Sequence, residues 1–144
     1  MDQSKLRQRI GTRADLIIGD AKENLAALNF DGRPLGAVMF DLDYYTSTRD
    51  ALPVLTGNHT LPRMWCYLDD IDGYPENCYV DAIGVRAAVS DFNRQSSDNQ
   101  VSRVYCFQGL APEEWHARIY ACHRLAHPDY NRCPERGKHQ LPLE

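Results

Sequence analysis

The chain has 144 residues, of which 43% are apolar, 25% charged and 10% aromatic, and these values are typical of one soluble globular domain. Lys and Arg together number 16 against 20 for Asp and Glu, so the formal net charge is -4. No basic block is present, which argues against nonspecific binding to nucleic acid. No apolar run approaches the roughly 20 residues of a membrane span, and residues 1–13 are polar and mixed in charge, so we expect a cytoplasmic protein without a membrane partner.

The five cysteines do not form a recognisable framework. Their number is odd and no two of them make a C-x-x-C pair, which argues against a set of disulfides and against a sulfur-rich zinc site. Cys66, Cys106 and Cys122 lie inside apolar stretches. We therefore expect these three to be small residues of the core.

The first predicted unit is a strand followed by a helix. Ala14–Ile18 is a short apolar run with β-branched residues that stops at a glycine, which favours a buried strand. Ala21–Leu28 contains strong helix formers with leucines three residues apart. Asp20 is placed to cap this helix, with Glu23 at the spacing of a capping box.

The same alternation then recurs. Leu35–Phe40 and Met64–Leu68 are further apolar runs that predict strands. A helix is expected to start at Ser47 or the following threonine, and Pro53 should make it short or kinked. Tyr79–Asn93 carries apolar residues at helical spacing and predicts the best helix of the chain.

The last predicted elements are strands. Val101–Phe107 alternates as a strand does, Ala117–Cys122 is a candidate for another, and Pro128–Glu144 predicts an irregular tail. Repeated alternation of strand and helix predicts an α/β fold with a mostly parallel sheet. Because no long helix is expected between the last two strands, one of them is free to run antiparallel at the edge.

Acidic residues follow two neighbouring predicted strands. Asp41 and Asp43 come after the first of them, and Asp69 and Asp70 after the second. Ligands of open parallel sheets bind beyond the carboxyl ends of the strands, so we expect these carboxylates to converge. Clustered carboxylates repel one another unless a cation or proton shares the site, and Mg²⁺ or Ca²⁺ prefers such oxygen ligands. The alternative is that these residues only cap the following helix or face solvent.

Three segments carry a resemblance to a known family. Phe40–Leu52, Leu68–Asp70 and Ala88–Phe92 resemble the downstream half of the macrocin-type O-methyltransferases, with a D-x-D-x-Y-x-S-T segment, a D-D pair and an A-V-x-x-F helix. The resemblance covers roughly residues 14–93. It implies a three-layer Rossmann-like methyltransferase fold, and transfer of a methyl group from S-adenosylmethionine to a small-molecule hydroxyl with the help of Mg²⁺.

The resemblance assigns roles to the acidic residues. It implies that Asp41, Asp69 and Asp70 are metal ligands, and that Asp41 or Asp43 is the base that removes the hydroxyl proton of the substrate. These roles are chemically consistent, because a bound cation lowers the pKa of a hydroxyl enough for a carboxylate to act as its base near neutral pH.

The resemblance also implies a cofactor contact, at the end of the first predicted strand. Gly19, Asp20 and Ala21 would border the adenine of S-adenosylmethionine, although the same residues also suit an ordinary helix start. The sequence departs from the family pattern in two places. Ile71 follows the D-D pair where the family has an aromatic residue, and the nine glycines contain no G-x-G. We therefore expect a sheet without the family's first two strands and a cofactor site of which about half is missing.

Three functions stay open at this point. The first is the methyltransferase, the second a truncated or degenerate relative that acts as a binding or interaction module, and the third a divalent-metal hydrolase.

His123 and His127 are expected either in hydrogen-bonded structural roles or in a substrate pocket or subunit contact. Self-association into a homo-oligomer also stays open.

Overall fold

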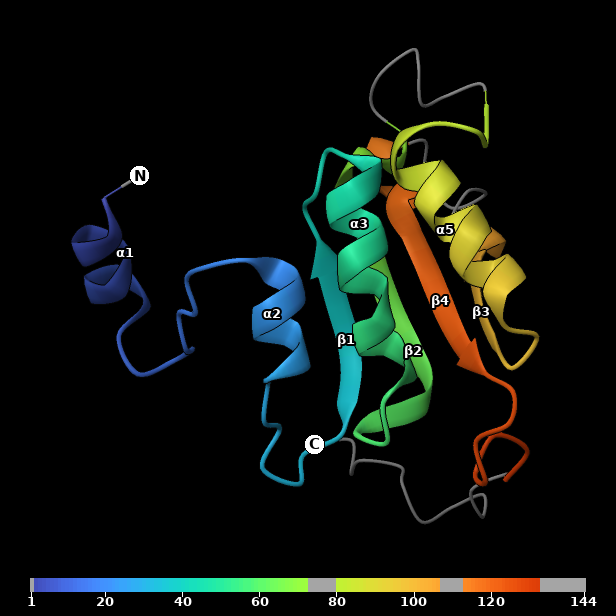
Figure 1. The fold of residues 1–144 in the computed structure, drawn as a ribbon, viewed down its shortest axis with the longest axis horizontal. Coiled ribbons are helices and arrows are strands. Elements are labelled where there is room, and N and C mark those ends of the chain that lie inside the picture. The colour runs from blue at the N-terminus through green and yellow to red at the C-terminus, as the bar shows by residue number, and fades with distance from the viewer. Residues whose placement is uncertain (1, 73–79, 107–112, 133–144) are drawn as a thin grey trace, which may run out of the picture.

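The computed structural model describes residues 2–72, 80–106 and 113–132. Within them the chain forms a mixed α/β fold in which helices and strands alternate (Figure 1). The elements follow one another in the order α1 (Gln3–Ile10), α2 (Ala21–Ala26), β1 (Leu35–Phe40), α3 (Tyr45–Ala51), η1 (Leu52–Thr56), β2 (Thr60–Leu68), η2 (Asp69–Ile71), α5 (Gly84–Gln95), β3 (Asn99–Arg103), η4 (Glu114–Arg118) and β4 (Ile119–Arg124).

The strands of the described residues form one sheet in the order β1-β2-β4-β3. β1 and β2 are parallel, whereas β4 is antiparallel to both β2 and β3. The prediction that one of the last two strands runs antiparallel is therefore confirmed, but this strand, β4, lies inside the sheet and not at its edge. The prediction of a mostly parallel sheet is wrong, because only one neighbouring pair of the described strands is parallel. The described part of the β3–β4 connection holds 3-10 turns but no α-helix that could carry the chain back for a parallel pairing.

Helices α3 and α5 lie over one face of this sheet, and α2 lies beside the outer edge of β1 (Figure 1). Alternate residues of β2 are buried beneath α3 and α5, whereas Trp65, between two of those residues, is 53% exposed. Each fully buried Leu, Val or Met side chain contributes about 1.5–3 kcal/mol to stability. The core includes Phe40, Leu52, Leu55, Met64, Cys66, Leu68, Val85, Ala88, Val101 and Cys122.

The opposite side of the sheet, which we call the open face, is covered by no described α-helix (Figure 1). The register places Ala37 beside Trp65 and Met39 beside Tyr67 on this face. Met39 is 77% exposed, so the edge strand β1 presents apolar surface to solvent. Trp115 of η4 lies at the same face, where it lines a shallow apolar cavity with Met39 and Trp65.

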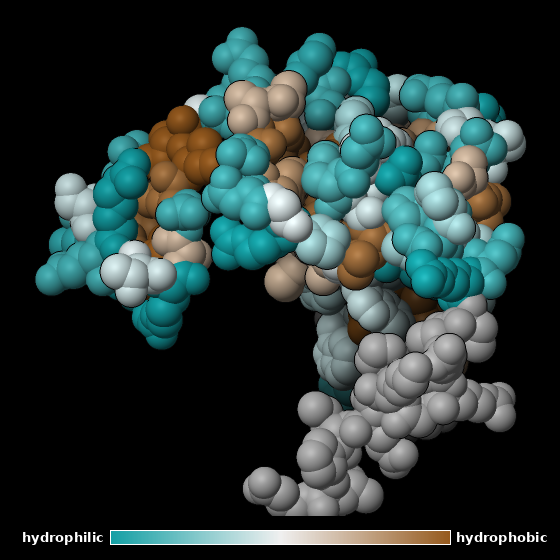
Figure 2. Space-filling model, turned by 90° about the horizontal axis from the view of Figure 1, so that it is seen from below, coloured by the Kyte–Doolittle hydropathy of each residue, from teal (hydrophilic) through white to brown (hydrophobic). Residues whose placement is uncertain are grey.

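The strand predicted at Ala14–Ile18 does not form. In the part of the chain that the structure describes, no backbone hydrogen bond joins these residues to β1 or to another strand. Ile17 and Ile18 are 54% and 47% exposed, and Figure 2 shows apolar surface on this N-terminal side of the molecule. The apolar pattern is that of a strand, but a strand needs a partner, and the described residues supply none here.

Other boundaries shift for local reasons. Pro53 falls in the 3-10 turn η1 directly after α3, which confirms the predicted short, broken helix. α5 begins at Gly84, later than the predicted Tyr79, which itself lies outside the described residues. The cap at Asp20 is confirmed, since its Oδ1 accepts a hydrogen bond of 3.2 Å from the backbone N–H of Glu23.

The cysteines divide between core and surface. Cys66 and Cys122 are buried, as predicted, and burial raises the pKa of their thiols to about 12 and about 11. Cys106 is exposed, so its predicted core position is wrong: β3 ends at Arg103, and the chain has left the sheet by residue 106. The remaining two cysteines lie outside the described residues.

None of the helices in the described ranges combines the length and the apolar character that crossing a membrane requires.

Candidate metal centre

Two acidic segments meet at the carboxyl ends of β1 and β2. The two strands are parallel, and their register pairs Phe40 with Leu68, the last residue of each. Residues that follow them therefore leave the sheet side by side. Asp41 follows β1, and Asp69 and Asp70 open η2 directly after β2. Each of these three offers a carboxylate oxygen, and the three oxygens lie within 4.8 Å of one another.

The fourth predicted acidic residue belongs to the same cluster. The pKa of the Asp70 carboxyl is raised above its ordinary value, first by burial and then by the negative charges of Asp43, Asp69 and Asp41. A hydrogen bond with Asp43 acts in the same direction. We call Asp41, Asp43, Asp69 and Asp70 the carboxylate cluster. The expected convergence is confirmed by geometry for Asp41, Asp69 and Asp70, and Asp43 joins them through its effect on the pKa of Asp70. A metal-binding role stays a prediction.

A basic residue from a distant segment holds one of the carboxylates. Arg118 of η4 places its Nη1 2.6 Å from Oδ1 of Asp69, and the Tyr67 hydroxyl donates to the same oxygen at 3.1 Å. The pKa of Arg118 is raised, mainly by its hydrogen bond with Tyr67 and also by the charge of Asp69. This pairing fixes one oxygen of Asp69 and offsets part of the negative charge of the cluster.

The carboxylates suit a divalent cation in chemistry and in spacing. Mg²⁺ and Ca²⁺ bind oxygen ligands at roughly 2.0–2.1 Å and 2.3–2.6 Å. Two oxygens on opposite sides of one ion are then about 4.2 Å apart for Mg²⁺ and about 4.6–5.2 Å apart for Ca²⁺. Separations of up to 4.8 Å among the oxygens of Asp41, Asp69 and Asp70 match these spans. One ion could therefore bridge the three after small side-chain movements.

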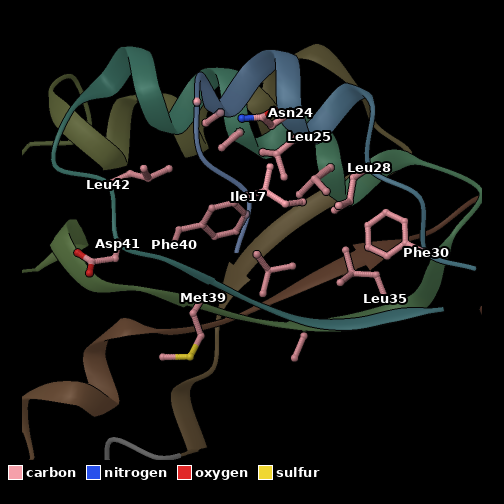
Figure 3. A pocket seen from close by; sticks show the side chains of 16 residues that line it. Ile17, Asn24, Leu25, Leu28, Phe30, Leu35, Met39, Phe40, Asp41 and Leu42 are labelled. Carbon is pink, nitrogen blue, oxygen red and sulfur yellow. The ribbon is translucent and has the colours of Figure 1, made fainter. Parts of the chain in front are cut away.

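The predicted cofactor residues lie beside this cluster. Gly19 and Ala21 line a cavity of about 590 Å³ between α2 and β1, and Asp41 lines the same cavity (Figure 3). Gly19 has φ +143°, and a Cβ there would lie 2.8 Å from the amide nitrogen of Asn24, so only glycine suits the position. Asp20 is not among the lining residues, because its side chain caps α2.

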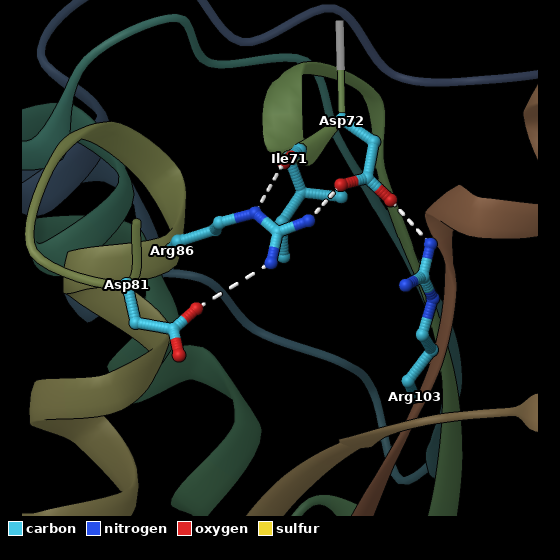
Figure 4. A network of polar contacts seen from close by, with 5 residues as sticks. All are labelled: Ile71, Asp72, Asp81, Arg86 and Arg103. Carbon is cyan, nitrogen blue, oxygen red and sulfur yellow. Dashed lines mark hydrogen bonds and ion pairs between the residues drawn. The ribbon is translucent and has the colours of Figure 1, made fainter. Parts of the chain in front are cut away.

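A second charged network lies directly after the cluster. The Asp72 carboxylate contacts the guanidinium groups of Arg86 on α5 and Arg103 on β3 (Figure 4). Arg86 also donates to the carbonyl oxygen of Ile71 at 3.0 Å and approaches Asp81 at 3.4 Å. The network ties the segment after η2 to a helix and a strand, and so holds the end of the loop that carries Asp69 and Asp70.

The two histidines singled out in the sequence are held by local hydrogen bonds. Nδ1 of His123 lies 2.8 Å from the hydroxyl of Tyr130, and Nδ1 of His127 accepts from the backbone N–H of Asp129 at 3.1 Å. Arg63, the cross-strand neighbour of His123, stacks over the ring of Tyr130. These contacts support the structural alternative for both histidines.

No family model matches the chain, and comparisons with curated proteins and with solved structures also give no match. The family resemblance consequently rests on the sequence motifs alone.

Proposed function

We propose that this chain carries the metal-binding part of an S-adenosylmethionine-dependent, Mg²⁺-assisted O-methyltransferase that acts on a small-molecule hydroxyl. The observation that supports this proposal best is the convergence of Asp41, Asp69 and Asp70 at the ends of two adjacent parallel strands. These are the residues to which the sequence resemblance assigns a metal, and they come together from segments 28 residues apart.

The mixed sheet is compatible with the finer fold that the resemblance implies. Two parallel neighbours with helices over one face, and ligand-type residues beyond the carboxyl ends, are features of an open α/β sheet. A three-layer Rossmann-like arrangement would need a further layer over the open face. It therefore remains part of the proposal.

In this function the carboxylate cluster has two roles. Asp41, Asp69 and Asp70 would hold the ion, which when bound supplies positive charge that acidifies and orients a hydroxyl. Asp43 or Asp41 would accept the hydroxyl proton. Asp43 suits the base better, because it lies next to the three ligands without being one of the closest set.

The cavity beside the cluster supports the cofactor part of the proposal. Apolar side chains of Leu25, Phe40 and Leu42 line it, and Gly19 leaves its backbone accessible at one end. Such a cavity of about 590 Å³ has the size and apolar lining of small-molecule sites in general. The methionine end of the cofactor has no such support, since the chain contains no G-x-G loop.

A second candidate is a non-catalytic relative that binds a divalent ion or a partner through the same carboxylates without transferring a methyl group. The third possibility, a divalent-metal hydrolase, would use the same carboxylates but has no further observation behind it.

Calorimetry and thermal unfolding separate these functions. For the methyltransferase we expect the chain to release or absorb heat on titration with S-adenosylmethionine or S-adenosylhomocysteine, and more strongly with Mg²⁺ present. Mg²⁺ alone at 100 times its Kd should stabilise the wild type by about 2.7 kcal/mol, and so raise its Tm by several degrees. Asp69→Ala should abolish that rise, whereas Asp98→Ala, at an exposed acidic residue outside the cluster, should retain it.

The outcomes point to different conclusions. A Mg²⁺ shift that depends on Asp69, without heat from either cofactor form, would support the non-catalytic binding module. If Mg²⁺ raises the Tm of neither the wild type nor the variants, the carboxylate cluster is structural and the proposed function is wrong.

A further inference from the structure

Two residues outside the carboxylate cluster hold one oxygen of Asp69. The guanidinium of Arg118 donates to Oδ1 of Asp69 at 2.6 Å, and the hydroxyl of Tyr67 donates to the same oxygen at 3.1 Å. Each oxygen of an ionised carboxylate has about two positions at which it can accept a hydrogen bond. Both positions of Oδ1 are therefore occupied, so an ion in the cluster would have to bind Asp69 through Oδ2.

The pairing of β2 with β4 supplies this arrangement. Tyr67 of β2 is in register with Ile119, the first residue of β4 and the neighbour of Arg118. The Arg118 side chain is only 21% exposed, and its Nη1 also lies 3.4 Å from the Tyr67 hydroxyl. Asp69 follows Tyr67 by two residues, so the strand pairing brings all three side chains together. We call Arg118 and Tyr67 the Asp69 clamp.

The two divalent ions that suit the cluster differ in how they use a carboxylate. Ca²⁺ binds roughly six to eight oxygens in a flexible geometry and can take both oxygens of one carboxylate. Mg²⁺ is smaller and requires a near-ideal octahedron of roughly six ligands. The two oxygens of a carboxylate share one carbon atom, and so lie too close together for neighbouring octahedral positions. Occupation of Oδ1 of Asp69 therefore removes a possible ligand of Ca²⁺ and none of Mg²⁺.

We propose that Arg118 and Tyr67 are positioning residues that make the carboxylate cluster bind Mg²⁺ in preference to Ca²⁺. This inference rests on the proposed function, which requires the ion, and adds how the ion is selected. The positive charge of Arg118 does not select by itself, because Mg²⁺ and Ca²⁺ carry the same charge and are repelled about equally. The selection comes from the hydrogen bonds of the Asp69 clamp to Oδ1.

The Kd values of the two ions test the clamp directly. Separate calorimetric titrations of the chain with MgCl₂ and CaCl₂ give the ratio of the Kd for Ca²⁺ to the Kd for Mg²⁺, which should exceed 1 in the wild type. Arg118→Met frees one acceptor position of Oδ1, and we expect the ratio to fall about tenfold, an effect typical of residues that hold a metal ligand. Tyr67→Phe removes the longer, uncharged hydrogen bond and should lower the ratio less.

Two further variants serve as controls. Arg118→Lys keeps a charged donor at the same position and should keep the ratio close to that of the wild type. Arg33→Met also removes one positive charge, but from a side chain that is 84% exposed and pairs with Asp31 instead of the cluster, so the ratio should not change. Circular dichroism and Tm without added metal show whether each variant is folded, and Tyr67→Phe decides the test if Arg118→Met is not.

The possible results separate this inference from the proposed function. If the wild type binds Mg²⁺ but folded Arg118→Met and Tyr67→Phe keep its ratio, the clamp does not select the ion, and the inference is overturned while the ion site stands. The inference is also overturned if the wild type binds Ca²⁺ more tightly than Mg²⁺, or if Arg118→Lys loses the preference as fully as Arg118→Met. A wild type that binds neither ion overturns both the inference and the proposed function.

Discussion

At the residue scale, the surroundings of Asp70 disfavour the charged form of its carboxyl. Burial and the nearby charges of Asp43, Asp69 and Asp41 raise its pKa in the folded protein. Below about pH 3.9, the ordinary pKa of an Asp side chain, the group is protonated in both the folded and the unfolded chain. It then does not lower the free energy of unfolding. As the pH rises through that value and then through the raised one, the unfolded chain loses its proton first, so stability falls.

Asp70→Asn removes this pH-dependent cost while keeping the shape of the side chain. In metal-free buffer we expect the variant to have a higher Tm than the wild type near neutral pH, and an equal Tm at about pH 3. Unfolding followed by circular dichroism across this range measures the difference. Asp98→Asn, at an exposed residue outside the cluster, should show no comparable trend. A difference that stays constant with pH would contradict the electrostatic explanation.

The partners of these residues could be predicted only in part. The four carboxylates were found because each pair directly follows an apolar run, and parallel neighbouring strands end at one edge. Arg118 gave no such signal, since 49 residues separate it from Asp69 and its segment has no distinctive pattern. Its role depends on β4 lying antiparallel beside β2, which local sequence does not determine.

At the scale of elements, two hydrogen bonds of the Asn93 side chain link α5 to β3. Its side-chain amide donates to the carbonyl oxygen of Val101 at 2.8 Å, and its Oδ1 accepts from the N–H of the same residue at 2.7 Å. Both backbone groups of Val101 would lose their partner in Asn93→Ala. We expect this variant to lower the free energy of unfolding by about 1–3 kcal/mol, measured by urea denaturation.

Gln95→Ala is the matched control on the same helix, because Gln95 is exposed. Its free energy of unfolding should stay within about 0.5 kcal/mol of the wild type. Equal losses in both variants would show that helix propensity, rather than the contact with Val101, determines the effect.

The elements themselves were predictable where the local pattern and the tertiary neighbours agree. Leu35–Phe40 forms a strand with the predicted bounds, because β2 pairs with it along its length. Ala14–Ile18 is also a largely apolar run but forms no strand, because a strand also needs a neighbour to accept its hydrogen bonds. The inner position of β4 was missed for a similar reason: the order of strands depends on connections, and residue patterns do not encode it directly.

At the scale of the whole molecule, Asp72 joins three parts of the fold. Its carboxylate contacts Arg86 and Arg103, and all three side chains are at most 23% exposed. Asp72→Ala would leave two largely buried guanidinium groups without this carboxylate. We expect a loss of about 3–5 kcal/mol in the free energy of unfolding, seen as a lower midpoint in urea.

Asp81→Ala provides the comparison for this network. Asp81 contacts the same Arg86, but its side chain is 80% exposed, and exposed ion pairs contribute about 0–1 kcal/mol. Its loss should therefore be several times smaller than that of Asp72→Ala. Similar losses in the two variants would mean that burial does not determine the strength of this network.

The paired ends of β1 and β2 make strand length a constraint on the candidate site. Asp41 and Asp69 face each other because Phe40 and Leu68 are in register. One residue inserted into either strand would advance its end by about 3.3 Å and turn the following side chains to the other face. Insertions at Gly57 or Asn58, before β2 begins, would leave that end unchanged. Relatives that keep the site should therefore tolerate length changes in the loop and exclude them from the two strands.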